Sequence, residues 1–413
     1  MERHDSAQRH ASRSMLSLPS HLLRGSARLA PPVAAVARRH HSTTSSSSSL
    51  SSAPPVIDLA PLRGLHPGEA PPSSLVAEVA TACEEWGFFQ VINHGVPSEL
   101  CNRALDQQHA FFALPTDVKE PMRRSADNSR GWYNDELTKQ RRDWKEGLDF
   151  GSTPPMDWAI DDDDPRNGTL DGYNRFPPAE RLPAFRSTVL EYYEALTGVA
   201  TELTRVFALG LGMPADHFEK VLRRGAHTSY LRLNYYPPYP GDDPSQLCIS
   251  PHKDAGFLTV LQQDPSCHSL QVRDRADAGN WVTVAPVAGA FTINTGDMAQ
   301  IWSNNRYFAP EHRVLTNPTK PRYSAPFFFN PAYTAAVAPL PSLGDAQYDE
   351  LSWGYFRAMR FAGDFADYGT EIQIADFAKE SGSWHVANQA AFMDAVDFNT
   401  SFDVEAMRPL LTR

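Results

Sequence analysis

Apolar residues recur every three or four positions in several stretches of the chain, which is the spacing of a helix with one buried face. The clearest such stretch runs from Pro183 to Gly212, and Pro214 follows as a stop signal. A shorter stretch begins at Ser73 or Ser74 and ends at Gly87. The pattern predicts helices at 73–86, around 98–112, at 183–212, at 350–362 and around 384–396.

Between residues 229 and 333 the chain changes to short β-rich runs separated by Gly, Pro, Asn and Asp. Runs of this kind at turn-separated intervals predict one all-β sandwich or barrel. Two earlier strands are expected at 56–59 and 88–92, the second followed by a turn at Asn93-His94-Gly95. The runs expected in the β-rich region are 230–236, 257–263, 270–272, 281–284, 290–293, 298–302, 313–315 and 322–330.

Composition narrows the class of protein. The 413 residues are 41% hydrophobic, 11% aromatic and 21% charged, which is typical of a folded chain with a large core. Since no run of 18 apolar residues occurs, no membrane-spanning helix is expected. The four cysteines form no Cys-x-x-Cys pair, which argues against a zinc knuckle or a disulfide framework and fits a reducing compartment.

The first 53 residues differ from the rest of the chain. They contain seven arginines, no lysine and only two acidic residues, and a Ser-rich run follows from Ser42 to Ser52. An Arg-rich, Ser-rich and acid-poor start is typical of a transit peptide. We therefore interpret 1–53 as a targeting segment and flexible linker, with an ordinary disordered tail as the alternative. A mitochondrion is the expected destination, while a cytoplasmic or plastid location stays open.

The remainder of the chain is acidic. The whole protein has a net charge of −11 although its first 53 residues are basic, and no basic stripe occurs in the folded part. Nucleic-acid phosphates require clustered Lys and Arg, so nucleic-acid binding is excluded.

Three residues of the β-rich region have the types and order of a metal site. Side chains two apart in an extended chain share a face, so His252 and Asp254 point the same way while Lys253 points away. His312 lies just before another β run, which a barrel can bring opposite the first. Two histidines and one carboxylate on one face leave three coordination positions open, the arrangement of non-haem Fe(II) oxygenases.

A second group of residues has side chains suited to binding a carboxylate. Arg322 and Ser324 share a strand face and lie shortly after His312. A guanidinium and a hydroxyl together hold a carboxylate by charge-assisted hydrogen bonds. Asn234 and Tyr236, also two apart on a predicted strand, can add an amide and a phenol to the same cavity.

Each of these pairs alone is more often a surface or structural feature than a binding site. A His-x-Asp commonly lies on a surface strand, and an Arg-x-Ser occurs routinely on exposed strands. Their joint order within one β-rich block is what favours a functional site.

With these residues and the segments around them, the chain resembles the plant-type branch of the Fe(II)- and 2-oxoglutarate-dependent dioxygenases, which also contains isopenicillin N synthase. The resemblance covers roughly 54–377. It implies a mainly β fold with flanking helices: a double-stranded β-helix (jelly roll) core with an N-terminal α/β extension. The segments that carry it are 55–59, 82–96 (ACEEWGFFQVINHGV), 232–238, 252–264 and 311–331.

The resemblance also assigns roles to residues. It implies that His252, Asp254 and His312 bind the iron, that Arg322 and Ser324 hold the distal carboxylate of 2-oxoglutarate, and that Asn234 and Tyr236 contact the same cosubstrate. Two departures lie beside the motifs: Tyr239 stands where a cysteine is common after the double proline, and Lys253 replaces a frequent small residue.

The expected domain organisation places the catalytic part in the second half of the chain. The boundaries are 1–53 for the targeting segment and linker, 54–212 for an N-terminal α/β region with a core helix, 213–377 for the jelly-roll domain and 378–413 for a C-terminal extension. The oligomeric state and the role of the extension stay open.

The implied function is the hydroxylation, desaturation or cyclisation of a small organic molecule with O2, releasing succinate and CO2. Fe(II) and 2-oxoglutarate are the expected cofactor and cosubstrate, with ascorbate as a further reductant. The family acts on hormones, flavonoids, alkaloids and amino-acid derivatives, which places the chain in secondary metabolism. Two alternatives stay open: an oxidase of the same fold that needs no 2-oxoglutarate, and a catalytically silent metal-binding protein.

Overall fold

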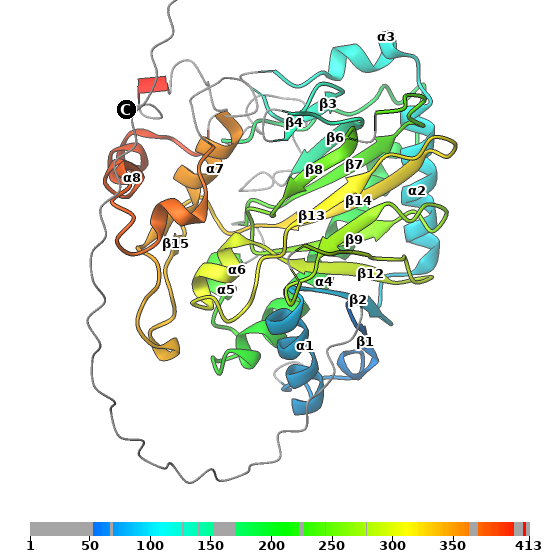
Figure 1. The fold of residues 1–413 in the computed structure, drawn as a ribbon. Helices are drawn as coiled ribbons and strands as arrows, with labels where there is room; N and C mark the ends of the chain where they lie inside the picture. The colour runs from blue at the N-terminus through cyan, green and yellow to red at the C-terminus, as the bar shows by residue number, and fades with distance from the viewer. Residues whose placement is uncertain are drawn as a thin grey trace, which may run out of the picture. The chain divides into compact units, whose positions relative to one another are not determined.

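The structure, a computed structural model of the chain, is built on two β-sheets that stack face to face (Figure 1). It describes residues 53–66, 69–125, 128–138, 141–151, 170–222, 227–243, 245–277, 279–362, 371–399 and 408–409. The predicted targeting segment and linker, apart from Ala53, lie outside the described residues.

The elements in chain order are as follows. The helices are α1 (Ser73–Glu85), α2 (Ser98–Phe112), α3 (Thr116–Lys119), α4 (Phe185–Gly210), α5 (Glu219–Leu222), α6 (Asp297–Trp302), α7 (Trp353–Ala362) and α8 (Trp384–Ala395). The strands are β1 (Val56–Asp58), β2 (Phe88–Ile92), β3 (Gly131–Tyr133), β4 (Leu137–Thr138), β5 (Arg141–Arg142), β6 (Glu146–Gly151), β7 (Tyr230–Tyr236), β8 (Leu247–His252), β9 (Leu258–Gln263), β10 (Leu270–Arg273), β11 (Trp281–Thr283), β12 (Phe291–Thr295), β13 (His312–Leu315), β14 (Arg322–Phe329), β15 (Ala336–Val337) and β16 (Leu351–Ser352).

The larger sheet has eight strands in the order β1-β2-β12-β9-β14-β7-β6-β3, and the smaller has four in the order β11-β10-β13-β8. Strands β1, β2, β3 and β6 come from the predicted N-terminal region, yet they extend the same sheet as β7, β9, β12 and β14. The structure is thus a jelly roll with flanking helices, as expected.

Helix α4 packs on the outer face of the larger sheet, where it contacts β9 and β14, and α2 contacts β14 beside it (Figure 1). The alternation of side chains along β7 explains this packing. Leu231 and Leu233 point to the helices and are fully buried, whereas Arg232 and Asn234 point to the opposite face. One face of the sheet therefore builds the hydrophobic core, and the other is free to line a site.

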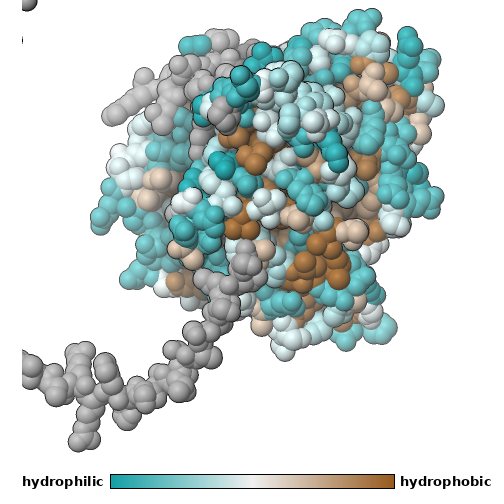
Figure 2. Space-filling model, turned by 45° about the vertical axis from the view of Figure 1, so that its right-hand side comes forward, coloured by the Kyte–Doolittle hydropathy of each residue, from teal (hydrophilic) through white to brown (hydrophobic). Residues whose placement is uncertain are grey.

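Most apolar side chains of the described residues are buried, and hydrophilic residues dominate the face shown in Figure 2, with hydrophobic ones in small separate groups. No helix within the described ranges has the length and hydrophobicity needed to cross a bilayer.

The predicted helices are confirmed, with small shifts at their ends. Helix α1 begins at Ser73, as expected, but Pro72 precedes it and no side chain caps its first turn. Gly87 then adopts a φ of +61°, the left-handed conformation that lets the chain turn into β2. Helix α7 begins only at Trp353, because the two residues before it form β16.

Two strand predictions were wrong. The run 298–302 is not a strand but part of α6, whose first amides are held by the loop before β9: Asp297 N donates to Asp254 O at 2.8 Å and Met298 N to Gly256 O at 3.0 Å. A short, largely buried helix has the same apolar run as a buried strand, so periodicity cannot separate them.

The second error concerns the residues before the predicted metal site. His252 was expected at the entrance to a strand, but it is the last residue of β8, a strand that the sequence did not predict. Pro251 lies within β8, and a proline inside a run argues against a strand, so the sequence pattern did not indicate β8. Proline is tolerated there because β8 lies at the edge of the smaller sheet.

Candidate active site

The pairing of β8 with β13 places two histidines side by side. His252 at the end of β8 lies directly opposite His312 at the start of β13, with ring centroids 4.3 Å apart. Asp254 lies two residues beyond β8, in the loop before β9. Its backbone carbonyl accepts a hydrogen bond from the amide of Asp297 in α6. His252 and Asp254 are close in the sequence, and His312 is distant from both. The fold brings all three together at one end of the smaller sheet.

The three side chains turn their ligand atoms towards one point. Oδ1 of Asp254 lies 3.7 Å from Nε2 of His252 and 3.6 Å from Nε2 of His312, and all three ligand atoms lie within 4.8 Å of one another. Neighbouring ligands of one ion bound at about 2.0–2.2 Å lie about 2.8–3.1 Å apart, so a small inward shift of these side chains brings all three within bonding reach of one ion. Two imidazoles and one carboxylate fit Fe(II), and they leave open positions for further ligands.

Backbone and side-chain hydrogen bonds fix these orientations. Nδ1 of His252 donates to Ser250 O at 2.9 Å and Nδ1 of His312 to Pro310 O at 3.2 Å, so both Nε2 atoms carry the free lone pair. The other carboxylate oxygen of Asp254 accepts from Thr259 Oγ1 at 2.5 Å and Asn294 Nδ2 at 2.7 Å. Such outer partners hold metal ligands in the productive rotamer and tautomer.

The protonation states of His252 and Asp254 also favour the binding of a metal cation. Burial and the neighbouring imidazole of His312 lower the pKa of His252 to about 3, so its ring is neutral at neutral pH. Burial alone would raise the pKa of Asp254. The two histidines and the hydrogen bonds from Asn294 and Thr259 outweigh burial and hold this pKa below its usual value. The neutral imidazole of His252 and the carboxylate of Asp254 therefore face the cavity.

The second predicted group lies on the larger sheet, across the cavity from the histidines. The register of β14 against β7 pairs Arg322 with Tyr236 and Ser324 with Asn234. Ser324 Oγ lies 3.2 Å from the Tyr236 hydroxyl and 3.4 Å from Asn234 Nδ2. The four predicted residues thus form one contiguous polar patch.

Arg322 is the least satisfied member of this patch. It is 2% exposed, and its hydrogen bond within the described residues is a long contact of 3.5 Å from Nη2 to Gln263 Oε1. Nε and Nη1 of Arg322, and Oδ1 of Asn234, have no partner among the residues that the structure describes. A buried guanidinium without a counter-charge is costly, so this position fits an anionic ligand such as the carboxylate of 2-oxoglutarate.

Both groups line a single cavity of about 630 Å³ between the two sheets. Alternate residues of β7 form its floor from one end to the other, Tyr236 and Asn234 first, then Arg232 and Tyr230. From Tyr230 to Tyr236 an extended strand rises about 20 Å, so the cavity has room for a second molecule beyond the patch around Arg322. Residues of α7 close the far end.

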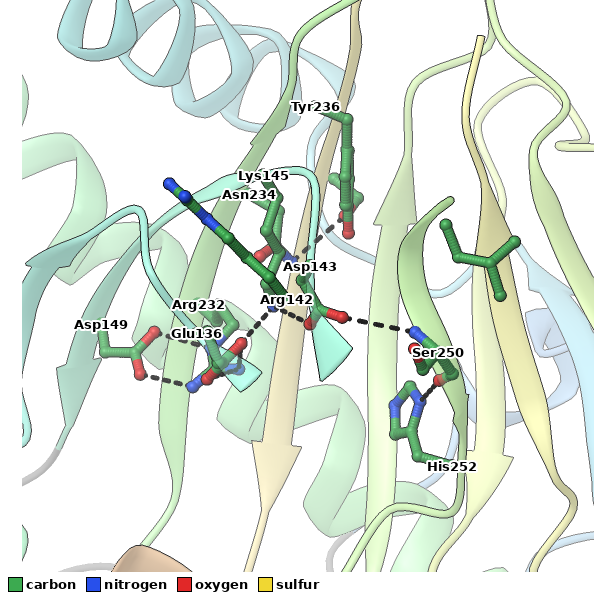
Figure 3. A network of polar contacts seen from close by, with 12 residues as sticks. Glu136, Arg142, Asp143, Lys145, Asp149, Arg232, Asn234, Tyr236, Ser250 and His252 are labelled. Carbon is green, nitrogen blue, oxygen red and sulfur yellow. Dashed lines mark hydrogen bonds and ion pairs between the residues drawn. The ribbon is translucent and has the colours of Figure 1, made fainter. Parts of the chain in front are cut away.

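A network of buried charges borders this cavity (Figure 3). Arg232 binds both oxygens of Asp149, at 2.9 and 2.8 Å, and lies 3.2 Å from Glu136. Lys145 lies 2.5 Å from Glu136 and 3.8 Å from Asp143. Burial by itself raises the pKa of Glu136, but the surrounding cations outweigh it and keep this carboxylate ionised.

The sequence did not predict several residues of the site. Thr259 and Asn294 hold Asp254, and Arg232 shares the cavity face of β7 with Asn234, a position that strand alternation could have identified. Lys145 and Asp149 also line the cavity, whereas their neighbours Trp132 and Phe150 are core residues.

Family comparison agrees with this geometry. A model described as the N-terminal part of the non-haem dioxygenases in morphine synthesis matches residues 54–179. The model of the 2OG-Fe(II) oxygenase superfamily matches residues 227–331, which contain all seven predicted site residues.

Individual relatives are similar over most of the chain. Jasmonate-induced oxygenase 2 of Arabidopsis thaliana is 34% identical over 293 residues, 70% of this chain and 73% of the relative. Oxoglutarate-dependent flavonoid 7-O-demethylase 1 of Ocimum basilicum is 36% identical over 296 residues, 70% of this chain and 71% of the relative. The crystal structure of JOX2 in complex with 2OG, Fe, and JA matches with a TM-score of 0.61 and 30% identity, covering 73% of this chain and 83% of that one.

Fold, donor set and comparisons together define a non-haem iron oxygenase. The chain belongs to the 2OG-Fe(II) oxygenase superfamily, and it is a 2-oxoglutarate-dependent dioxygenase that acts on a small molecule with Fe(II), 2-oxoglutarate and O2. The two alternatives, an oxidase without 2-oxoglutarate and a silent metal-binding protein, are not favoured.

Replacing Asp254 by Ala removes the carboxylate from the metal site formed by His252, Asp254 and His312. We expect loss of Fe(II) binding, measured by anaerobic calorimetric titration, together with loss of Fe(II)-dependent succinate formation. Glu311→Gln is the matched control, because Glu311 precedes His312 but pairs with Arg273 at 2.5 Å. An Asp254→Ala protein that binds Fe(II) as tightly as the wild type would contradict the assignment.

Replacing Arg322 by Gln should chiefly weaken the binding of 2-oxoglutarate. Loss of one charged hydrogen-bond set costs about 1.5–3 kcal/mol, so the KM for 2-oxoglutarate should rise roughly 10- to 150-fold while Fe(II) binding persists. Arg313→Gln is the control, since Arg313 binds Gln271 at 3.0 Å and stacks on Trp281. An unchanged KM in the Arg322 variant would place the carboxylate elsewhere.

Proposed function

We propose that the cavity between the sheets couples the oxidative decarboxylation of 2-oxoglutarate to the hydroxylation of a small organic molecule of secondary metabolism. His252, Asp254 and His312 hold the iron, and Arg322, Ser324, Asn234 and Tyr236 hold the cosubstrate. One observation supports this division most strongly: a triad suited to a cation and a buried guanidinium suited to an anion line the same cavity.

The overall reaction balances as 2-oxoglutarate, O2 and a substrate C–H giving succinate, CO2 and a C–OH. The bound iron supplies the activation of O2. The chain contributes the placement of the reactants: Arg322 neutralises the distal carboxylate, and Ser324, Tyr236 and Asn234 fix its orientation. The apolar side chains of Phe88, Leu261 and Val314 line the cavity, and they limit the access of water to the reacting centre.

The substrate occupies the far end of the cavity, beyond Asn234 and Ser324. There Tyr230 and Phe328 stack with ring centroids 4.6 Å apart, and Trp353 of α7 lines the same end. The guanidinium of Arg357 lies 5.0 Å from the Tyr230 ring, and that of Arg232 lies 5.7 Å from it. An apolar or aromatic body fits against the rings, and a polar group fits beside the guanidinium groups.

The charges of the wall favour an anionic polar group. The described cavity-lining residues include more bases than acids: Arg124, Lys145, Arg232, Lys253, Arg322, Arg357 and Arg360 against Glu136, Asp149, Asp254 and Glu371. Arg232 and Arg357 are positioned by Asp149 and Asp171 and still face the cavity. The JOX2 structure, which holds JA besides 2OG and Fe, supports room for a second molecule beside the cosubstrate.

A paired substrate screen tests this proposal. Small carboxylic acids with an aromatic or alicyclic body are compared with their methyl esters, and succinate release with Fe(II), ascorbate and 2-oxoglutarate is measured. We expect the acids to be preferred at least tenfold in kcat/KM, and Arg357→Gln to remove that preference. Equal or better turnover of the esters would contradict an anionic substrate without affecting the iron site.

We propose further that residues 1–53 direct the chain to a mitochondrion. The arginine-rich, acid-poor composition of this segment supports the proposal. A fusion of residues 1–53 to a fluorescent protein should localise to mitochondria, and charge reversal at Arg24 and Arg28 should abolish this localisation. A diffuse cytoplasmic signal or a plastid signal from the unaltered fusion would overturn it.

A further inference from the structure

Strand β8 carries an iron ligand at its end although it lies at the edge of its sheet. Its one neighbour in the sheet order is β13, so one side of β8 needs hydrogen-bond partners from elsewhere. His252 is also the most exposed of the three ligands: its side chain is 22% exposed, against 10% for His312 and 6% for Asp254. Its position therefore depends most on support from outside the sheet.

Residues 142–144 supply that support. Trp144 N donates to Leu247 O at 3.2 Å, and the side chain of Gln246 donates to Arg142 O at 3.1 Å. The carboxylate of Asp143 accepts the amide of Ser250 at 3.4 Å. This short segment occupies the free edge of β8 where a further strand would otherwise pair.

Asp143 connects this edge to the metal ligand through one residue. The amide of Ser250 donates to Asp143, and the carbonyl of the same residue accepts Nδ1–H of His252 at 2.9 Å (Figure 3). A carbonyl at this position sets the tautomer that leaves the Nε2 lone pair free for the metal. Holding the backbone at Ser250 therefore holds the imidazole.

The carboxylate of Asp143 is itself fixed by the buried network. Its side chain is 1% exposed, Lys145 lies 3.8 Å from it, and its own amide donates to Glu136 O at 3.1 Å. Lys145 in turn lies 2.5 Å from Glu136, which is tied to Arg232 on the cavity floor. A buried carboxylate needs nearby positive charge or hydrogen-bond donors. Here the carboxylate of Asp143 has both, and it points at β8, the strand that ends in the metal ligand His252.

We propose that Asp143 is a positioning residue for the iron site: through the Ser250 backbone it fixes the orientation of His252. The inference rests on the proposed role of His252 as a metal ligand. Asp143 is not among the described residues that line the cavity, and its contribution is the placement of Nε2.

Metal affinity is the direct readout. Co(II) serves as an air-stable probe for the metal site, and its dissociation constant is measured by calorimetry in the absence of 2-oxoglutarate. Loss of a direct outer partner of a metal-bound histidine typically weakens binding about 10- to 100-fold. Asp143 acts one hydrogen bond further out, so for Asp143→Ala we expect a loss at the lower end of this range, about tenfold. Asp143→Asn keeps an oxygen acceptor for the Ser250 amide and should stay within about threefold of the wild type.

The matched control is Asp274→Ala. Asp274 follows β10, which β13 separates from β8, and it accepts the Ala276 amide at 2.8 Å. This variant should bind Co(II) like the wild type, and its thermal unfolding provides the reference for a generic loss of an amide acceptor. The visible d–d spectrum of bound Co(II) should change in Asp143→Ala and not in Asp274→Ala.

His252→Ala separates the two possible failures. If His252→Ala loses Co(II) binding while folded Asp143→Ala binds with wild-type affinity and spectrum, the positioning role of Asp143 is overturned and the iron site stands. If His252→Ala binds Co(II) like the wild type, the proposed iron site itself fails. Equal weakening in Asp143→Ala and Asp143→Asn would also overturn the inference, because the acceptor oxygen would then not be the decisive feature.

Discussion

The register between β8 and β13 is the constraint on which the active site depends. It places His252 opposite His312, and a shift of one residue would turn one imidazole to the other face of the sheet. The loop beyond β8 brings Asp254 to the same point, and the hydrogen bond from Asp297 in α6 holds that loop. The iron site is thus a consequence of strand pairing and one anchored loop rather than of long flexible side chains.

The larger sheet adds the complementary charge. Across the cavity from the triad, β14 and β7 place the guanidinium of Arg322 beside the polar groups of Ser324, Asn234 and Tyr236. Both the Asp254 carboxylate and the Arg322 guanidinium are buried, and burial of either is costly without an opposite charge. A metal cation and an anionic cosubstrate satisfy these two needs, which explains why one cavity requires both.

Local patterns in the sequence predicted the five longer helices and most strands between residues 229 and 333, because these elements have one clearly apolar face, whereas β3 and β6 of the larger sheet were not predicted. These patterns failed where burial removes the pattern, as in α6, or where an edge position tolerates proline, as in β8. The seven site residues were identified from spacing and family resemblance, and the structure brings them to one cavity. Asp143, Glu136 and Lys145 were not assigned roles, because their contacts with β7 and β8 depend on tertiary packing that no local pattern records.

A crystal structure of the protein with Fe(II) and 2-oxoglutarate, grown without O2 and measured at the iron absorption edge, tests the central claim most directly. We predict one anomalous peak per chain, bonded to Nε2 of His252, Nε2 of His312 and Oδ1 of Asp254. A peak at another position, or any of these three atoms out of bonding reach of the ion, would contradict the account.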